Sequence, residues 1–300
     1  MTDEQRITNL SVPSGRIDVV LDTDAYNEID DQFAISYMMK AKDKLSVKAI
    51  CAAPFFNSRS EGPKDGMEKS YDEIMRLLSL MKESVDVFKG AGEYLADEKT
   101  PIISEASEML SQLAAEYSPE NPLYVVAIGA ITNVASALLL NPEMKNNVVV
   151  VWLGGHAHHY HDTKEFNMRQ DIAAARVVME SGVPFVQLPC AGVVDTFRIS
   201  RPELEYWLKG KNELSDYLVM NTINEADIKG MAWTRVIWDV TAVAWLLNDN
   251  DRFMSSRIIP ALIPDYDGLY EPDSAGPTIS YVYHINRDAL MTDLINKITN

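Results

Sequence analysis

The sequence has only two cysteines and no hydrophobic run long enough to cross a membrane. Cys51 and Cys190 both lie in apolar surroundings, which favours reduced structural thiols over a disulfide. The polar opening MTDEQRITNL lacks the apolar core of a signal peptide. These absences argue against a membrane-spanning protein and against a small disulfide-stapled secreted scaffold. They predict a cytoplasmic location.

Positive charge is also scarce. The chain has 27 lysines and arginines against 44 aspartates and glutamates, which gives a formal net charge of −17. Such a chain repels long phosphate backbones and anionic membrane surfaces. We therefore expect neither a nucleic acid polymer nor a membrane as a partner, and a neutral or cationic small molecule suits the composition better.

Short apolar segments alternate with helical patterns over the first two thirds of the chain. Strands are predicted at residues 17–21, 46–54, 85–90, 123–130, 147–155 and 183–189. Helices are predicted from residue 31 onward and at residues 68–83, 105–117, 131–140 and 171–182. This alternation predicts an α/β fold with a mainly parallel central sheet and helices on both faces, similar to an open Rossmann sheet.

The pattern turns mostly helical from about residue 200, which predicts a helical C-terminal part. There is no internal repeat, low-complexity tract or linker, and 47% hydrophobic content provides ample core. We therefore expect residues 1–300 to form a single domain.

Residues 20–33, VLDTDAYNEIDDQF, place five carboxylates within ten positions, directly after the first predicted strand. The helical pattern that follows puts them on a strand-to-helix turn, at the sheet edge where open α/β folds bind ligands. Helix capping accounts for Asp30 or Asp31. Asp22 and Asp24 would repel these groups inside the fold unless protons, hydrogen bonds or a cation intervened. A hard divalent cation, Ca²⁺ or Mg²⁺, fits best.

Other predicted strands also end in polar or small residues. Asn57 follows the second strand, Thr132 and Asn133 follow the strand at 123–130, and Gly154 and Gly155 close the strand at 147–155. Each could be an ordinary turn or capping residue. Because the carboxyl ends of parallel strands share one edge, we expect them to converge on one site.

The segment HAHHYH holds four of the five histidines, at positions 156, 158, 159 and 161. Clustered histidine suggests Zn²⁺, but the spacing matches no standard zinc pattern and supporting cysteines are absent. We instead predict a flexible loop with pH-sensitive polar groups beside the pocket, and we count His156 among the candidate substrate-binding residues.

Late in the chain, RVIWDVTAVAWLLN places Asp239 at the start of an apolar helix, directly after Trp238. An aspartate there is often only a helix cap. Its pairing with an aromatic residue that looks exposed makes both residues candidates for the pocket.

Together these segments resemble the inosine-uridine-preferring nucleoside hydrolase family over roughly residues 16–290. The family's opening signature is an aspartate pair, a short turn and a double aspartate, and this chain is similar to it at DTD and DD. Its later motifs resemble GAITN at 129–133, the glycine pair at 154–155 followed by EFN at 165–167, and WDVTAVAWLL from residue 238.

The resemblance implies calcium-dependent hydrolysis of the N-glycosidic bond of a ribonucleoside or a related N-riboside, with release of base and ribose. It places Ca²⁺ on the side chains of Asp24, Asp31 and Asp239 and on the carbonyl oxygen of Thr132. It also makes Asp24 the group that takes the proton from the attacking water.

The same resemblance implies that the ribose hydroxyls contact Asp30, Glu165 and Asn167, with Asn57 beside them. It favours a homodimer or a homotetramer. A ring of carboxylates suits this reaction, because departure of the base leaves positive charge on the sugar.

The chain departs from the family pattern at three places. The turn AYNEI is two residues longer than usual and lacks the Pro-Gly, and the segment HAHHYHDTK is short with no Gly-Asn before EFN. Trp238 stands where many relatives have a histidine that protonates the leaving base. Purine-specific relatives use tryptophan stacking instead, so we treat Trp238 as a catalytic candidate, with core packing as the alternative.

A Mg²⁺-dependent phosphatase of the haloacid-dehalogenase type is the main alternative, because it too has D-x-D after a first buried strand. Here Ala25 and Tyr26 follow the motif, where that family has Gly and then Thr or Val. An EF-hand is disfavoured, because Asn27 replaces the loop glycine, Phe33 replaces the bidentate glutamate, and a strand precedes the loop. A catalytically inactive binding protein stays open, although no missing metal ligand supports it.

Overall fold

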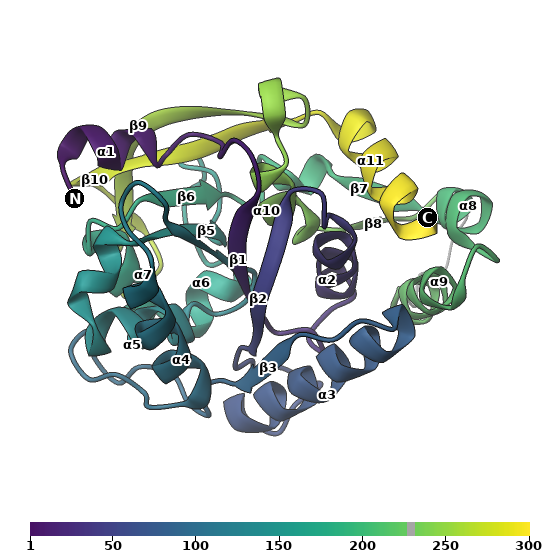
Figure 1. The fold of residues 1–300 in the computed structure, drawn as a ribbon, viewed down its shortest axis with the longest axis horizontal. Coiled ribbons are helices and arrows are strands. Elements are labelled where there is room, and N and C mark those ends of the chain that lie inside the picture. Colours follow the sequence, from purple (N-terminus) through teal and green to yellow (C-terminus); the bar gives the residue numbers. More distant parts are fainter. Residues whose placement is uncertain (227–231) are drawn as a thin grey trace.

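The computed structural model of the protein describes residues 1–226 and 232–300. Its centre is a sheet of eight strands (Figure 1). They are β1 (Ile17–Thr23), β2 (Leu45–Ala52), β3 (Asp86–Lys89), β4 (Leu123–Ala127), β5 (Val148–Leu153), β6 (Phe185–Leu188), β9 (Met254–Pro264) and β10 (Tyr270–Ile285). The order across the sheet is β3-β2-β1-β4-β5-β6-β10-β9, and every neighbouring pair is parallel except β10 with β9. The predicted mainly parallel sheet is confirmed.

The direction of the strand order reverses between β1 and β4. From β1 the chain adds β2 and β3 toward one edge, whereas β4 is followed by β5 and β6 toward the other. The connections on either side of the reversal therefore turn away from each other and leave a crevice at the carboxyl ends of β1 and β4. Open α/β sheets bind their ligands at this point.

Helices cover both faces of the sheet (Figure 1). One face packs against α2 (Asp30–Lys40), α3 (Pro63–Met81), α10 (Val240–Leu246) and α11 (Arg287–Thr299), and the other against α4 (Glu105–Leu113), α5 (Thr132–Leu140) and α7 (Ile172–Glu180). Alternate residues of β1 point to opposite faces: Val19 and Leu21 join the first core, and Val20 joins the second. Of the helices described, none has the length and apolar character needed to span a bilayer.

The C-terminal part contains several helices, as predicted, but the long strands β9 and β10 also lie in it, so the expectation of a mostly helical part is wrong for residues 254–285. This part contains α8 (Arg201–Glu203), a π-helical turn at Leu204–Leu208 and α9 (Glu213–Glu225), in addition to α10 and α11. The strands β7 (Arg198–Ser200) and β8 (Thr234–Val236) form a small antiparallel sheet there. The short helices α1 (Asp3–Thr8) and α6 (Phe166–Gln170) complete the set of helices described.

The long hairpin of β9 and β10 is the main element that the sequence does not predict. Pro260 lies inside β9 and Pro264 ends it, and prolines interrupt the alternating pattern by which a strand is recognised. The structure tolerates Pro260 because β9 is the outer strand of the sheet, where a missing N–H donor breaks no ladder on the open side. The hairpin therefore extends the sheet beyond β6.

Gly66 allows α3 to approach the chain beyond β2, which carries Asn57. A β-carbon at Gly66 would lie 2.1 Å from the carbonyl oxygen of Phe55. Alanine is the better helix former by about 1 kcal/mol, yet we expect Gly66→Ala to lower the free energy of unfolding by about 1–3 kcal/mol through overpacking. Gly62→Ala is the control, because nothing lies within 4 Å of that site. Urea denaturation measures both, and a Gly66→Ala protein as stable as the wild type would contradict the prediction.

Candidate active site

The end of β1 carries two buried aspartates to the point where the strand order reverses. The Oδ1 atom of Asp22 accepts a hydrogen bond of 2.7 Å from the side-chain nitrogen of Asn133. The Oδ1 atom of Asn133 accepts one of 2.8 Å from the backbone nitrogen of Ala91. Asp22 therefore joins the end of β1 to the first turn of α5, whereas Asp24 lines the cavity beyond it.

The turn after β1 is long enough to contribute side chains of its own. The backbone nitrogen of Asn27 donates to the carbonyl oxygen of Asp24 at 2.7 Å, which closes the turn. The side-chain nitrogen of Asn57 donates to Oδ1 of Asn27 at 2.6 Å, which ties this turn to the chain beyond β2. Asn27 and Glu28 both line the cavity. The longer turn thus adds polar residues to the site.

Three further carboxylates meet from two segments that are far apart in sequence. Asp30 and Asp31 begin α2, and Asp239 precedes α10, which packs against α2. Oxygen atoms of these three buried side chains lie within 4.8 Å of one another. Within residues 1–226 and 232–300, this is the group that could hold a metal ion, and no histidine belongs to it.

These acidic side chains perturb one another strongly. Burial, and then repulsion by Asp31 and Asp30, raises the pKa of Asp24 well above its usual range. Burial and the other carboxylates do the same to Asp239. Burial raises the pKa of Asp31 to about 7, although a 2.5 Å hydrogen bond from the Thr23 hydroxyl opposes this shift. A set of carboxylates with pKa values raised in this way stays ionised at neutral pH only if a positive charge lies beside it.

A divalent cation fits this arrangement. The donor atoms are all oxygen, and the buried Oδ2 of Asp24 and Oδ1 of Asp30 have no hydrogen-bond partner among the described residues. Ligands on opposite sides of a Ca²⁺ ion are separated by roughly 5 Å, since each lies about 2.3–2.6 Å away. Arg235 offsets the negative charge only in part: it forms an ion pair of 2.7 Å with Glu28, and burial and Glu28 still raise the pKa of Asp30 well above its usual range.

Thr132, the other predicted metal ligand, begins α5 and is buried. Its hydroxyl donates to Oδ2 of Asp171 at 2.8 Å. The side chain is therefore engaged away from the carboxylate group, and only the backbone carbonyl of Thr132 is left for the predicted role, which stays a prediction.

The opposite wall of the cavity is built on α6. Glu165 caps this helix: its carboxylate accepts hydrogen bonds from the backbone nitrogens of Asn167 (2.8 Å), Met168 (2.9 Å) and Gly155 (3.0 Å). The side-chain nitrogen of Asn167 donates to the carbonyl oxygens that follow β4 and end β5, at 3.2 Å and 3.0 Å. Both side chains are thus fixed at the cavity by the backbone around them.

The hairpin of β9 and β10 supports this wall. Gly155 has a φ of +75°, and a β-carbon there would lie 2.6 Å from the Tyr270 hydroxyl. That hydroxyl donates to the carbonyl oxygen of His156 at 2.8 Å. The backbone nitrogen of Thr163 donates to the carbonyl oxygen of Gly268 at 2.8 Å. The unpredicted hairpin therefore holds the segment between β5 and α6 in place.

The clustered histidines do not converge on a common point. His156 is half-buried and lines the cavity, and its Nδ1 is buried without a hydrogen-bond partner in the described part of the chain. The ring of His158 packs instead against Tyr270 and Tyr281, at centroid distances of 5.1 Å and 4.4 Å. Its Nε2 lies 3.2 Å from Oε1 of Gln187. The rings of His156 and His158 therefore lie in different surroundings.

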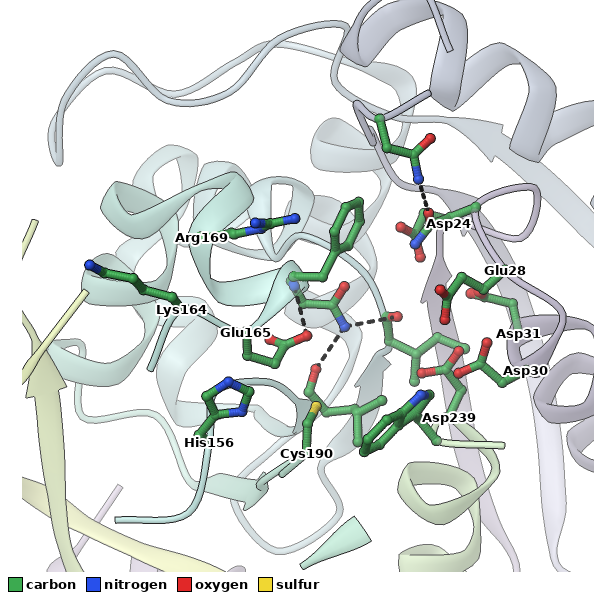
Figure 2. A pocket seen from close by; sticks show the side chains of 17 residues that line it. Asp24, Glu28, Asp30, Asp31, His156, Lys164, Glu165, Arg169, Cys190 and Asp239 are labelled. Carbon is green, nitrogen blue, oxygen red and sulfur yellow. Dashed lines mark hydrogen bonds between the residues drawn. The ribbon is translucent and has the colours of Figure 1, made fainter. Parts of the chain in front are cut away.

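The cavity has a volume of about 360 Å³, within the range of small-molecule sites. Every predicted site residue except Thr132 lines it, including Trp238, which is half-buried and also packs against the core. Figure 2 shows Asp24, Asp30, Asp31 and Asp239 on one side and Glu165 on the other. The other lining residues were not predicted as site residues from the sequence: Asn27, Glu28, Ile128, Leu153, Lys164, Phe166, Arg169 and Cys190.

The sequence contains features that could have predicted some of these lining residues. Lys164 and Phe166 flank Glu165 in sequence, and Arg169 lies one helical turn beyond it, so the EFN motif could have drawn attention to them. Ile128 and Cys190 lie just after β4 and β6, where strand ends meet the cavity. Their apolar neighbours made them look like ordinary core residues.

The reversed strand order and the buried carboxylates define an α/β protein with a small-molecule site at its switch point. The model of the inosine-uridine preferring nucleoside hydrolase family matches residues 19–264. The chain belongs to this family.

Curated relatives match parts of the chain. A probable ribonucleoside hydrolase of Dictyostelium discoideum is 33% identical over 91 residues, which are 30% of this chain and 27% of that protein. A pyrimidine-specific ribonucleoside hydrolase, RihA of Salmonella arizonae, is 29% identical over 192 residues, which are 55% of this chain and 58% of that protein. The chain thus spans about a quarter of the length of one relative and little more than half of the other.

Solved structures share the fold over nearly the whole chain. The plant nucleoside hydrolase PpNRh1 has a TM-score of 0.74 at 18% identity and covers 94% of this chain and 99% of its own. A purine-preferring ribonucleoside hydrolase from Gardnerella vaginalis has a TM-score of 0.73 at 17% identity, with coverages of 94% and 98%. The effector protein XOO4466 has a TM-score of 0.72 at 15% identity, with coverages of 99% and 95%. At these identities the likeness shows the fold alone.

The buried carboxylates predict how the stability of the metal-free protein depends on pH. Burial raises the pKa values of Asp22 and Asp31 to about 7, whereas an aspartate in an unfolded chain titrates at about 3.9. The folded state therefore binds more protons between these values, so its stability falls as pH rises from about 4 through 7. We expect the melting temperature in EDTA to fall between pH 5.5 and pH 8, and to fall less in CaCl₂.

Differential scanning fluorimetry measures both series. A bound cation supplies the positive charge that a proton supplies in the metal-free protein. The melting temperature should therefore depend less on pH in CaCl₂ than in EDTA. Equal slopes with EDTA and with CaCl₂ would show that the carboxylate group does not bind the ion.

Proposed function

We propose that the protein hydrolyses the N-glycosidic bond of ribonucleosides, or of a related N-riboside, and releases the base and ribose. The observation that carries this proposal is the meeting of Asp24, Asp30, Asp31 and Asp239 in one cavity at the switch point of the sheet. As the bond to the base breaks, the sugar takes on positive charge, and fixed carboxylates stabilise that charge electrostatically. Membership of the nucleoside hydrolase family supports the same reaction.

The proposed cofactor is Ca²⁺, held by the side chains of Asp24, Asp31 and Asp239 and by the carbonyl oxygen of Thr132. Ca²⁺ suits a rigid, buried set of oxygen donors, whereas Mg²⁺ usually keeps several waters and uses fewer protein ligands. When bound, the cation would orient the sugar hydroxyls and make the attacking water more acidic. Asp30 lies within the same group of oxygens and is proposed to face the sugar.

The protein's own side chains carry out the remaining steps. Asp24 accepts a proton from the water that attacks C1′ of the ribose, and the C1′–N bond breaks with its electron pair leaving on the base. Glu165 and Asn167, fixed by the surrounding backbone, position the sugar from the opposite wall, and Asn57 is proposed to lie beside the sugar-binding residues. Bound Ca²⁺ would keep Asp24 ionised at neutral pH, so that its carboxylate is available to accept this proton.

Trp238 is proposed to help the base to leave. It lines the cavity directly before Asp239, and its indole face can stack on a departing base. An indole cannot donate a proton as histidine does. The activation that it offers is therefore stacking.

Two further properties are part of this proposal. We infer that the protein acts in the cytoplasm, which the unpaired, buried cysteines Cys51 and Cys190 support. We also infer that residues 1–300 act as one domain and assemble as a homodimer or a homotetramer, in line with the family resemblance.

A panel of nucleosides tests the proposed reaction. Detection of reducing sugar should show release of ribose from at least one purine or pyrimidine nucleoside, and EDTA should abolish it until Ca²⁺ is restored. Asp24→Asn should lose at least about 10²-fold in kcat, because an amide cannot accept the proton. Asp72→Asn, on an exposed face of α3, is the matched control.

Calcium binding has to be measured on Asp24→Asn as well, since the residue has two proposed roles. Near-normal release of ribose by the metal-loaded variant would refute the role of Asp24. Release of phosphate from phosphorylated substrates, without release of base, would favour the phosphatase alternative, which neither the family match nor the solved structures support.

Trp238→Ala should slow natural nucleosides about tenfold more than p-nitrophenyl riboside. Stacking of an aromatic ring on a base contributes about 1–3 kcal/mol, and it is needed only when the leaving group is poor. Trp238→Phe should keep most of the activity, because the phenyl ring still stacks. Ratios of kcat/KM on the two substrates measure the effect. Equal losses on both would assign Trp238 to core packing.

A further inference from the structure

The cavity has opposite charges at its two ends, although the chain as a whole is strongly acidic. The carboxylates of Asp24, Asp30, Asp31 and Asp239 lie on one side, and Figure 2 shows His156, Lys164 and Arg169 on the other. These three basic residues come from one segment, which runs from the end of β5 through α6. The two sides of the cavity therefore suit different parts of one ligand.

Lys164 and Arg169 are held at the mouth of the cavity by contacts that leave their charges free. The stem of Lys164 lies against Gly268, where a β-carbon would come within 2.8 Å of Lys164 Cγ. The guanidinium carbon of Arg169 lies 5.4 Å from the centre of the Phe166 ring. Both side chains are exposed, and neither forms an ion pair with a residue that the structure describes.

Two other side chains at this end of the cavity, His156 and Glu165, affect which ligand could bind there. The Nδ1 atom of His156 is buried and has no hydrogen-bond partner among the described residues. Glu165 lies between the basic residues, but its carboxylate already accepts hydrogen bonds from three backbone nitrogens. The backbone donors thus engage this carboxylate, and Nδ1 of His156 and the exposed side chains of Lys164 and Arg169 remain for a ligand at this end.

The proposed reaction fixes how a riboside would lie in the cavity. In this arrangement the sugar hydroxyls held by Asp30 and the proposed Ca²⁺ face the aspartate side, and the base lies against Trp238, which adjoins Asp239. The remaining substituent of the ribose ring, at C5′, is then directed toward the opposite wall. Exposed charges elsewhere on the molecule contribute little there, because charges beyond a Debye length of about 10 Å are largely screened. The net charge of the chain is thus compatible with a local anion site.

We propose, on the basis of the proposed function, that His156, Lys164 and Arg169 bind an anionic group at the 5′ end of the substrate, a phosphate. The preferred substrates are then N-ribosides with a 5′-monophosphate, and the sugar product is ribose 5-phosphate. Guanidinium and ammonium groups form strong charge-assisted hydrogen bonds with phosphate. The site thus selects its substrate at the end of the molecule that does not react.

Matched pairs of substrates test the inference. Inosine and uridine are compared with their 5′-monophosphates, since reducing-sugar detection reports ribose and ribose 5-phosphate alike. We expect the wild type to prefer the monophosphates. Lys164→Ala and Arg169→Ala should each lower the ratio of kcat/KM for monophosphate over nucleoside by about tenfold, mainly through KM, because the phosphate is remote from the reacting bond.

Two variants serve as controls in the same assay. Lys211→Ala removes an exposed charge elsewhere and should leave the ratio unchanged. Lys164→Arg keeps the charge and should keep the preference. A wild type that prefers the nucleosides, or alanine variants with the wild-type ratio, would overturn the inference and leave the proposed hydrolysis intact.

Binding provides a readout that does not depend on turnover. In CaCl₂, ribose 5-phosphate should raise the melting temperature more than ribose or inorganic phosphate does at the same concentration, and Lys164→Ala/Arg169→Ala should remove that difference. Equal shifts with ribose and ribose 5-phosphate would refute the anion site. If no substrate releases a sugar, the proposed hydrolysis fails, and this comparison still decides whether the anion site exists.

Discussion

The structure depends on the mutual repulsion of carboxylates that are shielded from water. Burial raises the free energy of each charged group, and each neighbouring negative charge raises it further. A fold arranged only for stability would place such groups at the surface. Here the ends of β1, α2 and α10 are packed so that Asp24, Asp31 and Asp239 have to share one cavity. That arrangement is stable when a cation or a proton supplies the missing positive charge.

The rest of the architecture serves to keep this arrangement fixed. The hydrogen bond between Asp22 and Asn133 anchors the end of β1, and the Thr23 hydroxyl holds Asp31. On the other wall, the side chains of Glu165 and Asn167 form hydrogen bonds with the backbone around them. Asp31, Glu165 and Asn167 are therefore each oriented by a neighbour, which favours electrostatic stabilisation without reorganisation.

The sequence was sufficient to predict the sheet, the acidic turn and the pairing of distant motifs, because each of these features has a local signature. Five carboxylates after a buried strand cannot be mistaken for ordinary surface charge. The hairpin of β9 and β10 has no such signature, since Pro260 and Pro264 break its pattern. Lys164 and Arg169 escaped notice because a basic residue beside a motif looks the same whether it faces solvent or a ligand. Their position became informative only with the cavity in view.

The contribution of α10 to the carboxylate group has a consequence for how the protein is made. Asp24 and Asp31 are synthesised well before Asp239, so the group cannot be completed until α10 has been made and docks against α2. Contacts between residues so distant in sequence form late in folding. A truncated or half-folded chain would therefore have an incomplete ligand set, and tight binding of the ion would mark molecules that have finished folding.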